Sequence, residues 1–302
     1  MTINRQTQLL LLVEVVMFGA LGHLLFGLGL AGCVLFVLLV QLVLRVMVVL
    51  ATWGFSRFFA SPAPSLGVGG WLWMIGFEIY AYILTFNWLI PFEQPLMRRD
   101  RLAASPRPLL LVHGYGCNRG IWLPLVRRLE QRGHVVATLS LSPPFGHIDD
   151  MVPQLARRID AVLIATGAAR VVLIGHSMGG LVCRDYLALH GAGKVARLIT
   201  LATPHQGSEL ANLGIGDNAR EMEPGSGWLQ RFAAMPIAVA GVSVRTTHDN
   251  FVMPQDRQRM TGLEDLPLPG VGHLSLLYLP SLVPLIEQCL AEHHEETQKE
   301  RA

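Results

Sequence analysis

This sequence of 302 residues is poor in charge: Asp, Glu, Lys and Arg make up only 15%, and the net charge is +2. The small net charge excludes a polyanionic partner, and no basic stripe interleaves with aromatic residues, so no nucleic-acid partner is expected. Cysteine is also scarce, with four residues and no CxxC pair. The sequence therefore disfavours a disulfide framework and a structural zinc site.

Charge is almost absent from the first part of the chain. Residues 8–53 contain only Glu14 and Arg45, and residues 71–90 contain only Glu78. A bilayer core needs about 20 predominantly apolar residues per helix. We therefore predict a membrane region over residues 1–90, with three helices at about 8–28, 33–53 and 71–90.

The third apolar segment leaves an alternative open, because it contains Glu78 and Asn87. The alternative is a region of two spanning helices and one interfacial segment. In the three-helix interpretation Glu14, Arg45 and Glu78 all lie about 10 Å from one membrane face. Because unpaired charges in lipid are costly, Arg45 is expected to bridge to Glu14 or Glu78. Separate snorkelling of each side chain to the surface is the competing interpretation.

The arginines flanking the apolar segments bear on orientation. Three spans place Arg5 and Arg57 on one face and a larger group on the other, namely Arg98, Arg99, Arg101 and Arg107. Positive-inside counting then favours a cytoplasmic position for everything after the third span. A periplasmic position remains the alternative.

Residues 91–292 have the composition of a globular domain, and residues 293–302 form a charged tail. Short apolar runs alternate here with segments of helical spacing, which indicates an α/β fold with a parallel sheet. In such sheets, functional sites lie beyond the carboxyl ends of the strands. The expected strands cover about 109–112, 135–139, 170–174, 196–201 and 237–244, and the expected helices about 151–164, 180–189 and 279–292.

The segment Gly175-His-Ser177-Met-Gly179 lies between an expected strand and an expected helix. A serine on such a sharp turn has its hydroxyl exposed at the sheet edge, and the flanking glycines permit the tight backbone. Ser177 is therefore the predicted nucleophile. The competing interpretation, a plain glycine-rich turn, is weakened by the other elements around it.

Acyl transfer also needs N–H donors for the oxygen that becomes negative. In this architecture one donor is the N–H of the residue after the nucleophile, here Met178. The other is predicted to be the N–H of Tyr115, in the loop His113-Gly-Tyr115-Gly that follows an earlier strand. His113 itself is expected to fix the loop.

An acid and a base complete the expected site. Asp249 follows an expected strand, and His273 lies in a glycine-containing loop before the last helix. The order Ser177, Asp249, His273 is that of the strand–turn–helix hydrolases. His273 would transfer the proton, and Asp249 would orient the imidazole. The competing candidates are Asp217, Asp256 and Asp265 for the acid, and His248, His293 and His294 for the base.

These motifs resemble the α/β-hydrolase superfamily, and within it the bacterial lipases and esterases. The resemblance covers about residues 109–290 and includes the segment Leu201-Ala-Thr-Pro-His-Gln-Gly-Ser208. It implies a minimal α/β-hydrolase fold of about six mostly parallel strands, ester hydrolysis and no cofactor. Secreted lipases have no counterpart of the membrane region. Together these features suggest an integral protein of a bacterial inner membrane.

The expected substrate is a carboxylic ester, with membrane lipids as the nearest esters. Residues 208–235 are either a short lid over an acyl site or an ordinary surface connection. Phospholipase, lysophospholipase or acyltransferase activity would use the same triad. A thiol-dependent enzyme using Cys117 and a non-catalytic membrane module are the rivals from other classes. The expected partners are the ester or lipid substrate and membrane lipids, and protein partners are unknown from the sequence.

Overall fold

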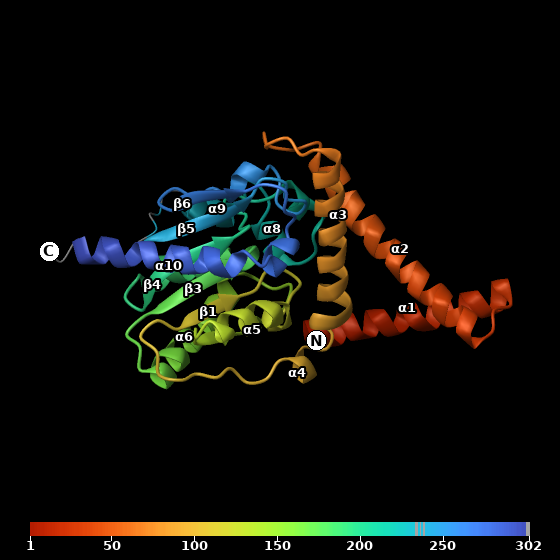
Figure 1. The fold of residues 1–302 in the computed structure, drawn as a ribbon, viewed down its shortest axis with the longest axis horizontal. Helices are drawn as coiled ribbons and strands as arrows, with labels where there is room; N and C mark the ends of the chain where they lie inside the picture. Colours follow the sequence, from red (N-terminus) through yellow and green to blue (C-terminus); the bar gives the residue numbers. More distant parts are fainter. Residues whose placement is uncertain (233–234, 236, 238, 300–302) are drawn as a thin grey trace.

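The computed structural model describes residues 1–232, 235, 237 and 239–299, with side chains described as far as residue 291. Three long helices come first: α1 (Ile3–Phe26), α2 (Leu30–Ser56) and α3 (Val68–Ile83), which continues as the π-helix η1 (Leu84–Leu89). All three are long and apolar enough to cross a membrane. In Figure 1 α1 and α2 form a hairpin that points away from the rest of the molecule, and α3 stands along the flank of the globular part.

The predicted ion pair of Arg45 is confirmed with Glu14, one of its two candidate partners. The two terminal guanidinium nitrogens of Arg45, Nη1 and Nη2, donate to the Glu14 carboxylate, each at 2.8 Å. The Arg45 Nε donates to Asn87 Oδ1 at 3.1 Å. Glu78 instead contacts the globular part, as described below. The outer surface of the hairpin consists of exposed apolar side chains, with Leu24 77% and Leu30 85% exposed.

The globular part is built on one sheet of six parallel strands in the order β2-β1-β3-β4-β5-β6. The α/β fold with a minimal sheet is therefore confirmed. The strands are β1 (Leu109–Val112), β2 (Val136–Thr138), β3 (Val171–His176), β4 (Val195–Leu201), β5 (Gly241–Thr246) and β6 (Glu264–Leu268).

The sequence prediction differs from the structure most at the β5–β6 edge. The expected strand 237–244 begins only at Gly241, and residues 236 and 238 lie outside the described residues. Strand β6 was not predicted. It contains Pro267 and only exposed or half-buried residues, and it is the last strand of the sheet, with a neighbour on one side only. An edge strand tolerates proline and polar residues that a central strand excludes.

Helices cover both faces of the sheet (Figure 1). One core lies between the sheet and helices α5 (Leu123–Gln131) and α10 (Leu282–Lys299), where Leu125, Leu129 and Ile286 are buried. The other lies under α6 (Val152–Thr166) and α7 (Met178–His190). The charged residues after 292 continue α10 as far as Lys299, and residues 300–302 lie outside the described part.

Short helices connect the main elements. They are α4 (Glu93–Leu96), η2 (Arg119–Trp122), η3 (Asp149–Met151), η4 (Glu209–Leu213), α8 (Asp217–Glu221), α9 (Gly227–Phe232), η5 (Gln255–Gln258) and η6 (Ser275–Tyr278). Several of them follow the carboxyl ends of the strands, where the predicted site residues lie.

Candidate active site

Ser177 occupies a strained turn between β3 and α7. Its backbone has φ 54° and ψ −129°, a conformation that non-glycine residues rarely adopt. Such strain is typical of functional positions. The glycines beside it have a steric reason: a Cβ on Gly179 would lie 2.2 Å from the Val112 carbonyl oxygen, and one on Gly175 would lie 2.6 Å from the Gly180 nitrogen. The geometry is the strand–turn–helix arrangement expected for a hydrolase nucleophile.

The loop after β1 passes directly beside this turn. A Cβ on Gly114 would lie 2.8 Å from the Ser177 Cβ, so only glycine allows the loop to approach so closely. Tyr115, the next residue, lines the same cavity as Ser177. Met178 is the first residue of α7, and the first N–H groups of a helix have no acceptor within it. The two predicted oxyanion donors therefore belong to segments that border Ser177.

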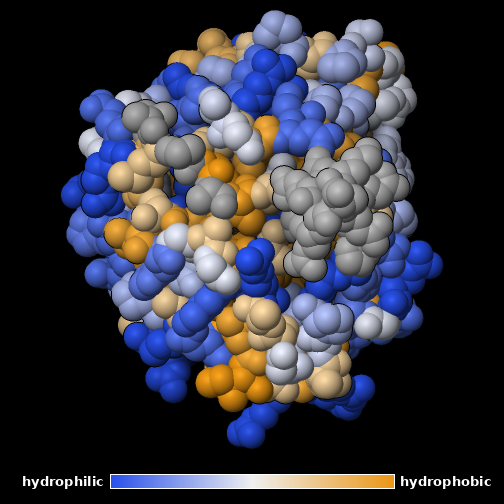
Figure 2. All heavy atoms as spheres, turned by 90° about the vertical axis from the view of Figure 1, so that its left-hand side faces the viewer, coloured by the Kyte–Doolittle hydropathy of each residue, from blue (hydrophilic) through white to orange (hydrophobic). Residues whose placement is uncertain are grey.

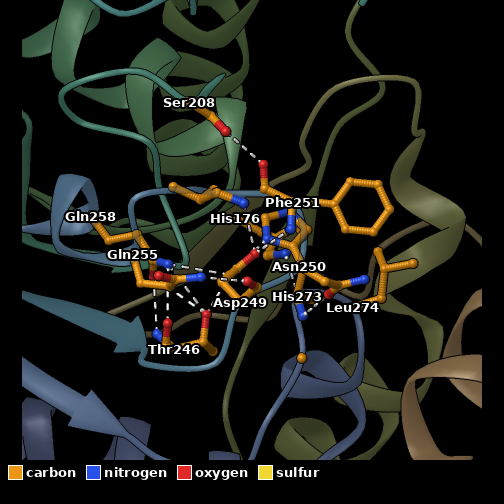
Figure 3. A network of polar contacts seen from close by, with 12 residues as sticks. His176, Ser208, Thr246, Asp249, Asn250, Phe251, Gln255, Gln258, His273 and Leu274 are labelled. Carbon is orange, nitrogen blue, oxygen red and sulfur yellow. Dashed lines mark hydrogen bonds and ion pairs between the residues drawn. The ribbon is translucent and has the colours of Figure 1, made fainter. Parts of the chain in front are cut away.

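Asp249 and His273 are in contact. The His273 Nδ1 lies 3.0 Å from the Asp249 Oδ2, and both side chains are buried (Figure 3). The other carboxylate oxygen, Oδ1, accepts the N–H groups of Phe251 at 2.7 Å and Val252 at 2.8 Å. Thr246 Oγ1 also donates to Oδ2. This network holds the carboxylate in one orientation against the imidazole.

The pKa values of the pair shift in opposite directions. Burial alone would raise the pKa of Asp249, but the charge of His273 and the surrounding hydrogen bonds outweigh it and hold this pKa below its usual 3.8. Burial alone would lower the pKa of His273, but the Asp249 carboxylate raises it above 6.5. Each partner thus favours the charged form of the other, as a base and its orienting acid require.

Ser177 and His273 line one cavity, which brings the third predicted member to the pair. Within the described part of the chain, no hydrogen bond joins their side chains. Catalytic hydrogen bonds are often long before substrate binds and tighten in the complex.

The competing residues have other contacts. Asp256 and Asp265 both pair with Arg245, and Asp217 lies beside His147. The His248 Nδ1 accepts the Gly270 N–H at 3.1 Å, which leaves this histidine a structural role. The side chains of the remaining candidates, His293 and His294, lie outside the described part.

Two further histidines border the site and are held neutral. His113 accepts the Leu141 N–H on Nε2 and contacts the Gly114 carbonyl through Nδ1, and burial lowers its pKa to about 4. It therefore fixes the loop, as expected. Burial and the neighbouring His273 lower the pKa of His176 to about 3. The His176 Nε2 contacts the backbone oxygen of His273 at 3.2 Å (Figure 3).

Sequence reasoning missed a contribution from α3. Glu78 is fully buried, and its two carboxylate oxygens accept the N–H groups of Leu274 at 2.9 Å and Ser275 at 2.8 Å. These are the residues that follow His273. A Cβ on Gly272 would lie 2.4 Å from the same carboxylate. Glu78 thus fixes the backbone of the loop that carries His273.

The C-terminal end of α2 holds the loop of Asp249 in the same way. Ser56 Oγ donates to the Asp249 carbonyl at 3.2 Å, and Trp53 Nε1 donates to the His248 carbonyl at 3.1 Å. Thr52 Oγ1 accepts the side-chain N–H of Asn250 at 2.9 Å. Two of the apolar N-terminal helices, α2 and α3, therefore fix the two loops that carry Asp249 and His273.

The cavity has a volume of about 710 Å³ and lies between the hydrolase fold and the N-terminal helices. One wall is formed by a single face of α1, where Ile3, Thr7 and Leu10 are spaced three or four residues apart. Tyr82 and Phe86, from the third apolar helix, extend this wall. They follow Glu78 at intervals of four residues. That spacing is the one sequence signal for their role, since it places all three on one helix face.

The segment after β4 forms the opposite wall. Residues 208–222 contribute several lining side chains, among them Leu210, Leu213 and Ile215. The Tyr115 hydroxyl donates to the Ile215 carbonyl at 2.7 Å and accepts the N–H of the same residue at 3.0 Å. Further on, Trp228 packs into the core under α6 and α7. Among the described residues of the 208–235 segment, those that line the cavity therefore lie between 208 and 222.

Neither a metal site nor a reactive thiol is evident. Among the described residues, no group of three or more His, Cys, Asp or Glu side chains is arranged to hold a metal ion. Burial raises the pKa of the Cys117 thiol to about 12, which disfavours the reactive thiolate.

Comparison with known proteins indicates an α/β-hydrolase fold. The family model described as alpha/beta hydrolase fold matches residues 107–220. A triacylglycerol lipase of Pseudarthrobacter phenanthrenivorans is 39% identical over 124 residues, which cover 37% of this chain and 38% of the lipase. A pimeloyl-[acyl-carrier protein] methyl ester esterase of Vibrio atlanticus is 37% identical over 97 residues, covering 32% and 36%. The chain thus spans just over a third of the length of these relatives.

Solved structures agree on the fold. The mature form of a Bacillus licheniformis lipase superposes with a TM-score of 0.54 at 21% identity, covering 64% of this chain and 95% of the lipase. Lipase B of Aspergillus fumigatus gives a TM-score of 0.52 at 15% identity, covering 59% and 50%. At these identities the likeness concerns the fold alone. Together with the family match, it shows that this chain has an α/β-hydrolase fold and resembles lipases and esterases.

Proposed function

We propose that this protein is a membrane-anchored serine hydrolase that cleaves carboxylic esters, with lipid esters as its natural substrates. One observation carries the proposal: the strained Ser177 lines a single cavity with largely apolar walls together with His273, whose other side contacts Asp249. A nucleophile, a base within reach and an acid that orients the base form the arrangement needed for acyl transfer.

The reaction follows from these positions. His273 Nε2 takes the proton of the Ser177 hydroxyl as its oxygen attacks the ester carbonyl. The N–H groups of Met178 and Tyr115 stabilise the oxyanion. The proton then passes from His273 to the leaving alcohol, and an acyl-enzyme remains on Ser177. A water molecule, deprotonated by His273, releases the acid and restores the serine. Asp249 stabilises the imidazolium in both half-reactions.

The apolar walls support a lipid as the source of the acyl group. Leu10, Leu213 and Ile215 line the cavity and are 56%, 68% and 65% exposed. Apolar side chains in such positions favour an acyl chain, and the N-terminal helices would hold the cavity close to lipids. The arginines near the apolar segments favour a cytoplasmic position for the hydrolase domain.

An ester panel on the full chain in detergent tests the proposal. Ser177→Ala and His273→Ala should each lower turnover to near background, since triad members act as a unit worth up to about 10⁶ in rate. Cys117→Ser should retain activity, because its thiol is not the nucleophile. Full turnover by a folded Ser177→Ala protein would overturn the proposal.

Parallel assays with acylglycerols, phospholipids and lysophospholipids, with and without an added alcohol acceptor, would identify the head group. They would also separate hydrolysis from acyl transfer, which the same three residues could perform.

A further inference from the structure

The hairpin of α1 and α2 contacts the hydrolase domain at both of its outer ends. At the start of α1, Ile3 is buried in the same core as Leu89 and Ile90, and Gln8 Nε2 donates to the Pro91 carbonyl at 2.7 Å. At the end of α2, Ser56 bonds the loop of Asp249. Residue 3 and the hydrolase domain therefore lie on one side of any membrane that the hairpin enters.

This contact restricts how many helices can cross. Three consecutive crossings would place residue 3 and residue 91 on opposite sides of the bilayer. The hydrogen bond from Gln8 to Pro91, and the burial of Ile3 and Ile90 in one core, therefore require an even number of crossings. We infer that only α1 and α2 cross the membrane, and that α3 lies along the bilayer surface, between the hydrolase domain and the lipid.

The contacts of α3 extend along its whole length. Trp71, near its beginning, packs edge-on against the His248 ring at 5.7 Å. Near the middle of the helix, Glu78 binds the loop of His273. Further along, Thr85 Oγ1 lies 2.6 Å from the Tyr278 hydroxyl in η6. At 1.5 Å per residue these contacts cover roughly 20 Å of the helix. A spanning α3 would draw the hydrolase domain into the hydrocarbon over that depth.

The hydrolase domain is unsuited to hydrocarbon. Its β5–β6 edge carries the ion pairs of Arg245 with Asp256 and Asp265. Figure 2 shows the face turned away from the helices, and hydrophilic residues, in blue, are spread over it with smaller apolar areas between them. Charged groups at membrane depth are costly unless they face a protein interior.

The side of α3 that faces away from the domain suits an interface. Trp73, Tyr80 and Trp88 are 66%, 55% and 59% exposed, and Leu72 is 68% exposed. Tryptophan and tyrosine are enriched where hydrocarbon meets head groups, because one end of each ring system is apolar and the other forms hydrogen bonds. A helix lying in the head-group region would use such a face.

The hairpin, in contrast, has the features of a spanning pair. Glu14 lies eleven residues from the start of α1 at Ile3, and Arg45 lies eleven residues from the end of α2 at Ser56. Each is about 16 Å along its helix, so the bidentate pair joins equal depths. Residues 15–44 contain no Asp, Glu, Lys or Arg, whereas Arg5 and Arg57 flank the outer ends. This asymmetry is typical of a hairpin inserted from the cytoplasmic side.

Cysteine labelling of the full chain with a membrane-impermeant maleimide tests the inference. Thr2→Cys, Ser65→Cys and Ala169→Cys place exposed thiols before α1, between α2 and α3, and on the hydrolase domain. Gly29→Cys places one at the hairpin tip, where nothing lies within 4 Å of the new Cβ. Leu30→Cys is a second tip variant. The parent chain with its four cysteines gives the background.

We expect Ala169→Cys to label from the same side as Thr2→Cys and Ser65→Cys, with both tip variants labelled only from the other side. The variants that are labelled in intact cells should be protected in inverted vesicles, and those that are protected in cells should be labelled in the vesicles. Labelling of Ala169→Cys together with the tip would show three crossings and overturn the inference. Labelling of all positions from one side would show that the hairpin does not cross, which would overturn it as well. Neither result depends on activity.

Discussion

The α1–α2 hairpin and α3 are all long and apolar enough to cross a membrane, yet their charged side chains have different partners. The hairpin faces outward with exposed leucines, and its buried charges, Glu14 and Arg45, bind each other. Helix α3 turns its one carboxylate, Glu78, toward the hydrolase domain, where it binds the backbone beside His273. A charged residue in an apolar helix thus either pairs with a charge on a neighbouring apolar helix or binds a loop of the candidate active site.

The largest expected difference is in kcat/KM, between a variant that lacks the Glu78 carboxylate and one that lacks the Glu14 carboxylate. Glu78→Gln replaces an acceptor oxygen with an N–H₂ group that opposes a backbone N–H, so the loop of His273 should shift. A displacement of about 1 Å in a catalytic group can cost roughly a hundredfold in rate. We expect a loss of that order in kcat/KM on a short soluble ester. Glu14→Gln, the matched change in the hairpin, should leave this value almost unchanged, and equal losses in both variants would contradict the comparison.

Stability should show the opposite pattern. Arg45→Leu leaves the Glu14 carboxylate unpaired, and we expect it to lower the stability of the protein in detergent by about 1–2 kcal/mol, the range found for polar contacts between membrane helices. Combining it with Glu14→Gln should recover much of the loss, because contacting residues are non-additive. Combining it with Glu78→Gln should give additive losses. Thermal unfolding of the parent, the three single variants and the two double variants measures both couplings.

The hairpin should affect substrate choice without affecting chemistry. Leu10 lines the cavity, whereas Leu12, exposed to a similar extent, does not. Leu10→Trp should fill part of the acyl site and reduce kcat/KM for long-chain esters about fivefold, with acetate esters unaffected; one missing or added methylene is worth about 1–3 kcal/mol in such pockets. Leu12→Trp is the control. The same chain-length profile in both variants would show that α1 does not border the bound acyl chain.

The smallest expected effect is a displacement of the pH profile. His273 must be neutral to accept the serine proton, so kcat/KM should fall as pH drops through its pKa, which lies above 6.5. Glu78 is one of the charges that raise this pKa. Removing it disfavours the imidazolium, and the acid limb of Glu78→Gln should move to lower pH. The limb of Glu14→Gln should coincide with that of the parent protein, and a limb that stays in place for Glu78→Gln would assign Glu78 a purely structural role.

Much of the hydrolase fold could be predicted from the sequence, because buried parallel strands such as Leu109–Val112 are continuous apolar runs. The candidate triad could be predicted because its glycines and turns follow from close backbone approach, as at Gly179. Strand β6 could not, since its residues are exposed or half-buried and include Pro267, so no apolar run marks it. The role of Glu78 could not either, because its partners are backbone N–H groups nearly 200 residues away. Hydropathy measures the composition of a helix and not what packs against it.

Covalent labelling tests the central claim most directly. The full chain in detergent is treated with a fluorophosphonate, which phosphonylates an activated serine, and the modified residue is identified by mass spectrometry of its peptides. We predict modification at Ser177, absence of labelling in Ser177→Ala, and slower labelling in His273→Ala and Glu78→Gln, with Glu14→Gln reacting at the parental rate. A folded protein that remains unlabelled, or that is labelled at another residue while Ser177 stays intact, would contradict the account.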